Sequence, residues 1–382
     1  MTDDVFEIHK KHTGILGIEG DFPVENKEEL GLAYTPGVAQ VAKAIQKDPK
    51  LKDVYTMSGK LVAVVTDGTA VLGLGNIGPG AGLPIVEGKA LLYKDLAQVD
   101  AVPLALEPED ATTMAHHLQA IAPSFAGFHL EDIAAPKCFE LEEELRKLVD
   151  IPVYHDDQEG TAIVILAGLI NAARVVQKPL SELKVVLNGV GASGVATARL
   201  LDAVGLKRLT LVDVDGVVHP DSQNYNHYQT DLAQNFQGVA GETLDDVIAD
   251  QDVFIGLSVA NVLSPQQVQR MAAQPIIFAL ANPVPEIDPE EARAAGATVV
   301  ATGSSKYPNQ VNNILAFPGL YRGLLQSGIK SVTPAMEATV AKALAGMIAT
   351  PTAQTIVPGV FDAGVVQTVS QAVMELENNT EK

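Results

Sequence analysis

The chain has 382 residues, of which 47% are hydrophobic, and its 47 Asp and Glu residues outnumber its 26 Lys and Arg residues, so that the formal net charge is −21. At roughly 150 residues per domain this length predicts two or three domains, and the excess of acid argues against a nucleic-acid binder, which needs basic surface against phosphates. With no apolar run of about 18 residues, a polar N-terminal segment unlike a secretory signal and a single cysteine, Cys138, a cytoplasmic protein without membrane contact is expected.

The first half of the chain alternates predicted strands and helices. A buried strand over 61–65 ends in the turn TDGT, and a helix is predicted over 84–97. Further strands are predicted over 101–106, 125–130 and 151–155, separated by the helical stretches DATTMAHHLQAI and CFELEEELRKLV. This alternation predicts a layered α/β architecture.

The second half repeats the alternation more regularly. The apolar stretch 161–176 predicts a buried helix between the two halves, and the tail from about 330 predicts helices that pack back on the first half. Strands are predicted at VVLN, RLTLVD, DVFIGLS, PIIFALA and ATVVATG. Their spacing is typical of a doubly wound, Rossmann-like parallel sheet. We therefore expect two α/β domains, 1–160 for substrate and metal and 161–382 for a dinucleotide.

Two segments match G-x-G-x-x-G, the first at Gly73, Gly75 and Gly78. A dinucleotide cradle needs a strand before it, a helix that starts at its third glycine, and an acid about 20 residues further on. The prolines and glycines after Gly78 are expected to prevent an immediate helix. We therefore interpret the first copy as a tight turn without a nucleotide.

The second copy meets all three conditions. The strand VVL precedes it, a helical stretch follows it, and Asp213 ends the next strand 19 residues after Gly194. The helix N-terminus would face the pyrophosphate and the acid would reach the ribose. The predicted cradle consists of Gly189, Val190, Gly191, Ala192, Ser193 and Gly194.

Two acidic pairs follow predicted strands, Glu131 with Asp132 and Asp156 with Asp157. If those strands are parallel neighbours, the four carboxylates meet at one edge of the sheet. A hard divalent cation, Mg²⁺ or Mn²⁺, would then neutralise them. In the alternative interpretation they are solvated loop acids or helix N-caps, as Asp157 would be for a helix beginning near Thr161.

Lys89 and Tyr34 are candidates for proton transfer. Lys89 is expected in the first turns of its helix, where the positive end of the helix dipole would lower its pKa and make it a base. The alternative is an ordinary surface lysine. Tyr34 lies before a Pro-Gly turn, and it is either a packing aromatic or an acid.

At this point the chain resembles the short bacterial form of malic enzyme over essentially its full length. The segments that carry the resemblance are YTPGVA (34–39), TDGTAVLGLGNIGP (66–79), GLPIVEGKALL (82–92), HLEDI (129–133), YHDDQEGTA (154–162), NGVGASG (188–194), FALANP (278–283) and NQVNNILAFPG (309–319). Their number and order make the match specific.

The resemblance implies the oxidative decarboxylation of L-malate, through oxaloacetate, to pyruvate and CO₂, with reduction of NAD and a divalent metal. It implies that Tyr34 is the general acid and Lys89 the general base. It also implies that Asp156 supports the catalytic centre from beside the metal ligands. The implied metal ligands are Glu131, Asp132 and Asp157.

The resemblance further implies that Asn282 and Asn313 contact substrate and nicotinamide, with Asn313 favoured over Asn312, and that the enzyme is a homodimer. The first glycine loop would shape the substrate side. In longer members an arginine shortly after the TDG turn grips a malate carboxylate. Here Thr69, Ala70 and Val71 follow that turn, which leaves open how the second carboxylate is held.

The nucleotide is expected to be NAD rather than NADP. Asp213 favours a free ribose hydroxyl, Asp215 adds negative charge where a 2′-phosphate would lie, and no Lys or Arg follows closely.

Three alternative functions stay open. One is a metal-dependent oxaloacetate decarboxylase of the same family. The second, a malolactic enzyme, is disfavoured because its relatives are expected to be longer. The third is an NAD-responsive binding protein without chemistry.

Overall fold

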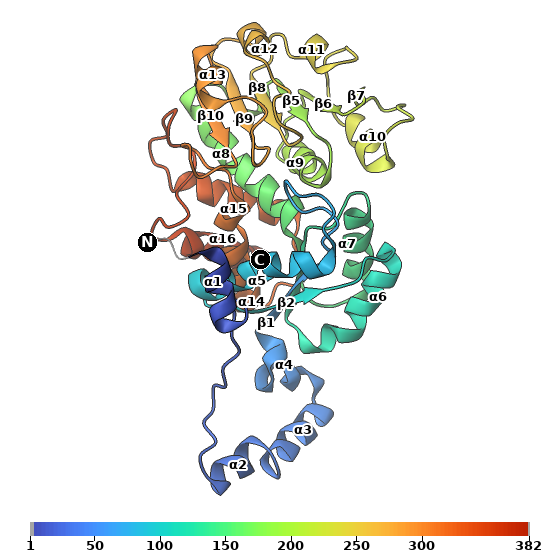
Figure 1. Ribbon diagram of the computed structural model, residues 1–382, viewed down its shortest axis with the longest axis vertical. Coiled ribbons are helices and arrows are strands. Elements are labelled where there is room, and N and C mark those ends of the chain that lie inside the picture. The colour runs from blue at the N-terminus through green and yellow to red at the C-terminus, as the bar shows by residue number, and fades with distance from the viewer. Residues whose placement is uncertain (1–3, 381–382) are drawn as a thin grey trace.

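The computed structural model describes residues 4–380, so that residues 1–3 and 381–382 of the two predicted domains lie outside it. Two β-sheets lie one above the other along the long axis of the molecule, and helix α8 passes between them (Figure 1). Each sheet carries helices that connect its strands, which confirms the predicted α/β class. None of the helices over residues 4–380 is both long and apolar enough to cross a lipid bilayer.

The first sheet has four parallel strands in the order β2-β1-β3-β4. The central strand β1 is buried along almost its whole length, which explains its continuous apolar run LVAVV. Strands β3 and β4 are hydrogen-bonded neighbours, so their carboxyl ends meet at one edge. The elements are β1 (Leu61–Thr66), α5 (Gly78–Ala97), β2 (Asp100–Ala105), α6 (Ala111–Ile121), β3 (Gly127–Glu131), α7 (Lys137–Leu148) and β4 (Val153–His155).

The second sheet has six strands in the order β10-β9-β8-β5-β6-β7. The chain leaves β5 toward β6 on one side and later returns to β8 on the other, so β5 lies at the point where the winding reverses. All pairs are parallel except β6 with β7, as expected for a doubly wound sheet with one added edge strand. The elements are β5 (Val185–Asn188), α9 (Ala192–Ala203), β6 (Leu209–Asp213), β7 (Gly216–Val217), α10 (His227–Ala233), α11 (Leu244–Val247), β8 (Val253–Gly256), α12 (Pro265–Arg270), β9 (Ile276–Ala279), α13 (Pro289–Ala294) and β10 (Val299–Thr302).

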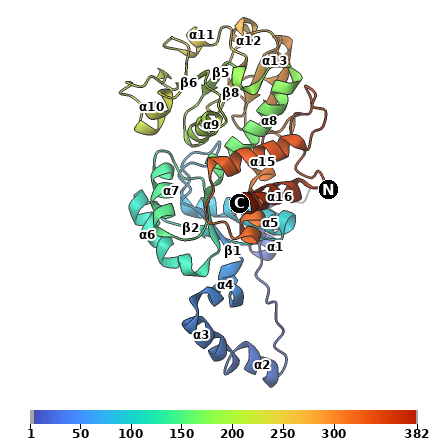
Figure 2. The same ribbon diagram turned by 180° about the vertical axis from the view of Figure 1, so that it is seen from behind.

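Helix α8 (Thr161–Val175) is buried nearly all round, as its composition predicts. Helices α15 and α16 lie side by side (Figure 2), α16 also packs against α14, and α14 contacts α5. The hydroxyl of Tyr321 on α14 donates to the carbonyl oxygen of Phe128 in β3. The tail predicted from about residue 330 comprises α15 and α16, which pack on α8 and on α14, and it is α14 that contacts the first domain directly. The bounds are α14 (Phe317–Ser327), α15 (Pro334–Gly346) and α16 (Val365–Thr380).

The start of α5 differs from the prediction. We expected no helix directly after Gly78, but α5 begins at that residue. Pro79 lies in the first turn, where its missing N–H costs nothing because that group has no helical partner anyway. Pro84 lies inside the helix and removes one backbone hydrogen bond, a cost that is offset by burial of the helix against β1 and β2.

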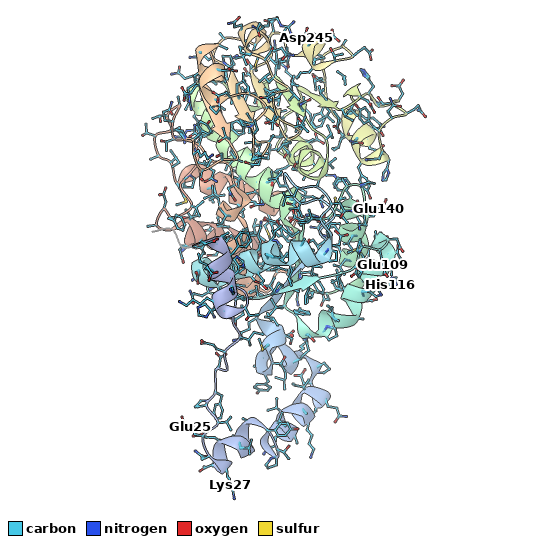
Figure 3. All side chains as sticks on the ribbon, in the orientation of Figure 1. Glu25, Lys27, Glu109, His116, Glu140 and Asp245 are labelled. Carbon is cyan, nitrogen blue, oxygen red and sulfur yellow. The ribbon has the colours of Figure 1, made fainter. Side chains whose placement is uncertain are left out.

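The N-terminal helices are arranged differently from the rest. Helix α1 lies beside the body of the molecule, whereas α2 and α3 stand away from it at the lower end of Figure 1. Figure 3 shows Glu25 and Lys27 at the tip of this projection. We call residues 17–57 the arm. The bounds are α1 (Val5–His12), α2 (Lys27–Ala33), α3 (Gly37–Lys47) and α4 (Lys52–Tyr55).

Candidate active site

Three carboxylates converge where β3 and β4 end. Glu131 is the last residue of β3, Asp132 follows it, and Asp157 lies in the π-helical turn η4 (Asp156–Gly160) that continues from β4. One carboxylate oxygen from each lies within 4.8 Å of the others. Asp157 also accepts a 2.7 Å hydrogen bond from the backbone N–H of Asp132. Parallel pairing of the two strands is what brings these acids together.

The local environment of this carboxylate cluster favours a cation. Burial, and after it repulsion among neighbouring carboxylates, raises the pKa of Glu131, Asp132 and Asp157, while the charge of Lys89 opposes the rise. Oxygen ligands of this kind suit Mg²⁺ or Mn²⁺. The N-cap alternative does not apply, because Gly160 occupies the N-cap of α8 and no side chain caps it. The donor set therefore fits a hard divalent ion.

A second nearby group does not have the character of a metal site. His129, Glu131 and Asp156 also lie close together. Both ring nitrogens of His129 are already engaged, one with the Tyr93 hydroxyl and one with Glu131, each at 2.8 Å. Burial lowers the pKa of His129 to about 3, so the ring is neutral. We interpret this group as the buried hydrogen-bonded support of the cluster.

Lys89 reaches the same point from α5. Its Nζ donates to Asp156, lies 3.2 Å from a Glu131 oxygen and 3.3 Å from Oδ1 of Asn313, and sits 4.7 Å from the Phe317 ring centre. Because α5 begins at Gly78, Lys89 is in the middle of the helix, and the expected effect of the helix dipole was wrong.

The expected direction of the pKa shift of Lys89 was wrong as well. Burial alone would lower the pKa of Lys89, but the charges of Asp156, Glu131 and Asp157 outweigh it and raise the pKa. A lysine in this state is a proton donor and an ion-pair partner. It becomes a base only when the neighbouring negative charge is neutralised.

The Asp156 carboxylate is fixed by two side-chain partners. It is fully buried, accepts a 2.5 Å hydrogen bond from the Tyr154 hydroxyl and pairs with Lys89. A side chain on Gly160 would collide with both Asp156 and Tyr154. Sequence reasoning missed Tyr154 as the partner of Asp156 and Phe317 as the neighbour of Lys89, although they lie in the segments YHDDQEGTA and NQVNNILAFPG.

Tyr34 is not beside this cluster in the single chain. It caps the C-terminus of α2 and is 66% exposed. Helices α2 and α3 pack against each other on the projecting arm, and this arm stands away from α5, the helix that carries Lys89 (Figure 1). The assignment of Tyr34 as the general acid therefore stays a prediction.

The second glycine loop has the form that the fingerprint requires. It connects β5 to α9, which begins at Ala192. A side chain on Gly194 would collide with the carbonyl oxygen of Gly189, whereas one on Gly191 would enter open space. Asp213, at the end of β6, accepts a 3.2 Å hydrogen bond from the N–H of Val190. The loop and the acid thus form one unit, and Asp215 lies exposed just beyond it.

One cavity of about 420 Å³ joins the two regions. Part of its wall is the glycine loop at the N-terminus of α9, and part is Asp157 with the amides Asn282 and Asn313. Ala70 and Leu72, from the first glycine loop, complete the wall. The first loop therefore shapes the cavity, as the resemblance implied. Asn312 also lines the cavity, but its side chain caps the 3₁₀ turn η6 (Asn313–Leu315).

Comparison with known families identifies the architecture. A family model described as the malic enzyme N-terminal domain matches residues 21–118, and one described as the malic enzyme NAD-binding domain matches residues 158–376. The chain belongs to the malic enzyme family. The resemblance predicted from the sequence is thereby confirmed.

Individual relatives agree with this membership. The chain is 46% identical to the NAD-dependent malic enzyme of Geobacillus stearothermophilus, covering 100% of this chain and 80% of that protein. It is also 46% identical to the bifunctional malic/malolactic enzyme of Bacillus subtilis, over 100% of this chain and 94% of that protein. An NADP-dependent malic enzyme of Escherichia coli is 43% identical over 85% of this chain and 43% of its own length.

A solved structure of the family has the same fold. The crystal structure of the NAD-dependent malic enzyme from Thermotoga maritima superposes with a TM-score of 0.94 at 42% identity, covering 97% of this chain and 99% of that chain.

The Bacillus subtilis relative corrects the expectation that malolactic enzymes are longer than this chain. Because this chain spans 94% of a protein named for malolactic activity, chain length does not separate malic from malolactic enzymes.

Proposed function

We propose that this malic enzyme oxidises L-malate and decarboxylates the oxaloacetate formed, releasing pyruvate and CO₂, with NAD as the electron acceptor. The observation that carries the proposal is the cavity that joins the glycine loop to the carboxylate cluster and Lys89. A four-carbon hydroxy acid in that cavity lies between a cation site and a dinucleotide site. This is the arrangement that oxidation at C2 followed by loss of CO₂ requires.

Glu131, Asp132 and Asp157 are the proposed ligands of Mn²⁺ or Mg²⁺. When bound, the ion supplies a Lewis acid that stabilises negative charge on substrate oxygens. Lys89 is the proposed base at the C2 hydroxyl, since its Nζ borders the cluster. The negative charge that holds its proton would be offset by a cation bound to the cluster. Asp156 positions Lys89 through their ion pair.

The remaining assignments follow from the cavity wall. Asn282 and Asn313 are proposed to orient substrate and nicotinamide, because both line the cavity and Asn313 also accepts from Lys89. Gly189, Gly191 and Gly194, with the residues between them, are proposed to hold the pyrophosphate at the N-terminus of α9. The adenosine ribose is proposed to lie at Asp213 and Asp215.

We further propose a division into domains at about residue 160, a homodimeric assembly and a location in the cytoplasm. The division is supported by the position of β4 before that residue and of α8 and β5 after it. The location is supported by the single cysteine, Cys138, which is buried.

The proposed reaction is tested by absorbance at 340 nm with purified protein, L-malate, Mn²⁺ and either NAD or NADP. The expected result is formation of NADH together with an equal amount of pyruvate. Lactate without NADH would instead identify a malolactic enzyme, which the Bacillus subtilis relative makes the second candidate. Cleavage of oxaloacetate without any oxidation of malate would identify a decarboxylase.

Replacement of Asp215 by serine is expected to raise NADP use relative to NAD by about tenfold, because one negative charge is removed where a 2′-phosphate would lie. The ratio of kcat/KM for the two nucleotides measures the effect. Asp95→Ser removes an equally exposed charge from α5 and serves as the matched control. An unchanged ratio in Asp215→Ser would show that Asp215 does not face the adenosine ribose.

A further inference from the structure

Glu286 is a buried carboxylate to which the proposed function assigns no role. It lies in the loop between β9 and α13, and its exposed fraction is 0%. Glutamate is almost never fully buried without a charged partner, yet among residues 4–380 no Lys, Arg or His forms an ion pair with Glu286. Its charge must therefore be held by other groups.

Backbone N–H groups surround this carboxylate. Oε1 accepts a 3.1 Å hydrogen bond from the N–H of Ser258, and Oε2 accepts a 3.0 Å hydrogen bond from the N–H of Ala281. Both oxygens thus act as acceptors, as they do in an ionised carboxylate. Burial raises the pKa of Glu286, but the backbone hydrogen bonds oppose the rise. The side chain is therefore a buried negative charge held by backbone dipoles.

The two donors belong to loops that line the cavity. Ser258 lies just after β8 and Ala281 just after β9, and both contribute to the cavity wall. A side chain on Gly256, the last residue of β8, would collide with the Glu286 carboxylate. Because glycine allows this close approach, one side chain can bind both loops.

The loop after β8 packs on the dinucleotide cradle. The Ser258 hydroxyl accepts a 2.8 Å hydrogen bond from the side chain of Asn188 at the end of β5. A side chain on Gly189 would collide with Leu257 and Ser258. A change in the position of this loop would therefore be felt by the cradle.

The loop after β9 leads to Asn282. Ala281 directly precedes this residue, whose amide is proposed to orient substrate and nicotinamide. Since Glu286 binds the N–H of Ala281, it fixes the backbone from which the Asn282 side chain extends. Glu286 thus connects the dinucleotide cradle to Asn282.

We propose that Glu286 is a positioning residue for the nicotinamide half of the cavity and that its charge favours NAD⁺ over NADH. The inference rests on the proposed function, which places the nicotinamide beside Asn282. The nicotinamide ring carries a positive charge in NAD⁺ and none in NADH. The carboxylate cluster would be offset by its cation and Asp156 by Lys89, whereas Glu286 has no such partner. A buried negative charge under these loops therefore stabilises the oxidised ring more than the reduced one.

The ratio of the two nucleotide affinities tests the charge. Glu286→Gln keeps the size of the side chain and removes its charge, so the dissociation constant of NAD⁺ is expected to rise about tenfold more than that of NADH. Calorimetric titration with NAD⁺ and fluorescence titration with NADH, with Mn²⁺ present and malate absent, measure the two constants. Glu290→Gln removes an exposed charge from the first turn of α13 and is the matched control. An unchanged ratio in Glu286→Gln would overturn the preference for NAD⁺.

Glu286→Asp separates position from charge. The shorter side chain keeps the charge but does not reach both backbone N–H groups, so both nucleotides are expected to bind about tenfold more weakly while their ratio stays near the wild-type value. Wild-type affinities in Glu286→Asp would overturn the positioning role, and this variant decides that role even if Glu286→Gln does not fold. A wild-type protein that binds neither nucleotide would instead overturn the proposed cofactor.

A double-mutant cycle tests whether Glu286 acts through Asn282. If it does, the losses in kcat from Glu286→Gln and Asn282→Ala are less than multiplicative in the double variant, because both changes disturb the same amide. Multiplicative losses would show that the two residues act independently, and the connection between Glu286 and Asn282 would be overturned.

Discussion

Replacement of Lys89 by alanine is expected to lower kcat for malate oxidation by about 10²–10⁴-fold, the usual contribution of a positioned base. Lys89 Nζ is the cationic group held between Asp156, Glu131 and Asn313. Its removal leaves the C2 hydroxyl without a proton acceptor. Initial rates of NADH formation at saturating malate, Mn²⁺ and NAD measure the effect.

Lys89→Arg is the matched control for charge. Arginine keeps a cation beside Asp156 and Glu131, but its guanidinium stays protonated and therefore cannot act as a base. If Lys89 acts by proton transfer, both variants lose activity, while the arginine variant keeps the thermal stability that the alanine variant loses by leaving Asp156 buried and unpaired. Substantial malate oxidation by Lys89→Arg would show that Lys89 contributes charge alone.

The substrate supplied decides which step is affected. With oxaloacetate in place of malate the oxidation is bypassed, so Lys89→Ala should be less impaired than with malate. Tyr34→Phe keeps the size of the side chain and removes the phenol proton, so it should still cleave oxaloacetate. Uptake of solvent deuterium at C3 of pyruvate, corrected for uncatalysed exchange, is the step that should change in Tyr34→Phe.

The sequence was sufficient wherever local pattern and sheet topology together determine position. Alternating strands and helices predict parallel pairing, and parallel pairing places Glu131 and Asp157 at one edge without any knowledge of the distance between them. The glycine loop was predicted equally well, because its strand, its helix and Asp213 are all local in sequence.

The predictions that were wrong or incomplete depended on the bounds of helices and on contacts between residues distant in sequence. Two prolines suggested a late start for α5, and that error put Lys89 at a helix N-terminus. The expected lowering of its pKa failed because neighbouring carboxylates from β3 and η4 raise it. Tyr154 and Phe317 contact the Asp156–Lys89 pair from other elements. The periodicity of apolar residues in the sequence does not indicate contacts of this kind. The exposed position of Tyr34 at the end of α2 depends on how the arm folds away from the first sheet, which no local pattern in the sequence indicates.

Asp157→Asn is expected to weaken Mn²⁺ binding by at least about tenfold, because it removes one of three converging ligand charges. The amide oxygen can still accept the hydrogen bond from the N–H of Asp132, so the local fold should persist. Calorimetric titration of the purified protein with Mn²⁺, in the absence of substrate, gives the affinity directly. Asp156→Asn is the matched control, since Asp156 pairs with Lys89 outside the ligand set and should change the affinity only a few-fold.

The pH dependence of Mn²⁺ affinity and the thermal stability of the metal-free protein test the assignment of Asp157 as a metal ligand further. Burial and neighbouring carboxylates raise the pKa of Asp157 in the metal-free protein, so protons compete with the ion, and Mn²⁺ affinity should rise with pH as the cluster deprotonates. Removing one of the mutually repelling charges should also make metal-free Asp157→Asn at least as stable to heat as the wild type at neutral pH. Unchanged Mn²⁺ affinity in Asp157→Asn, or an equal loss in Asp156→Asn, would place the ion elsewhere. A lower melting temperature of metal-free Asp157→Asn than of the metal-free wild type would show that Asp157 stabilises the fold rather than serving as a metal ligand.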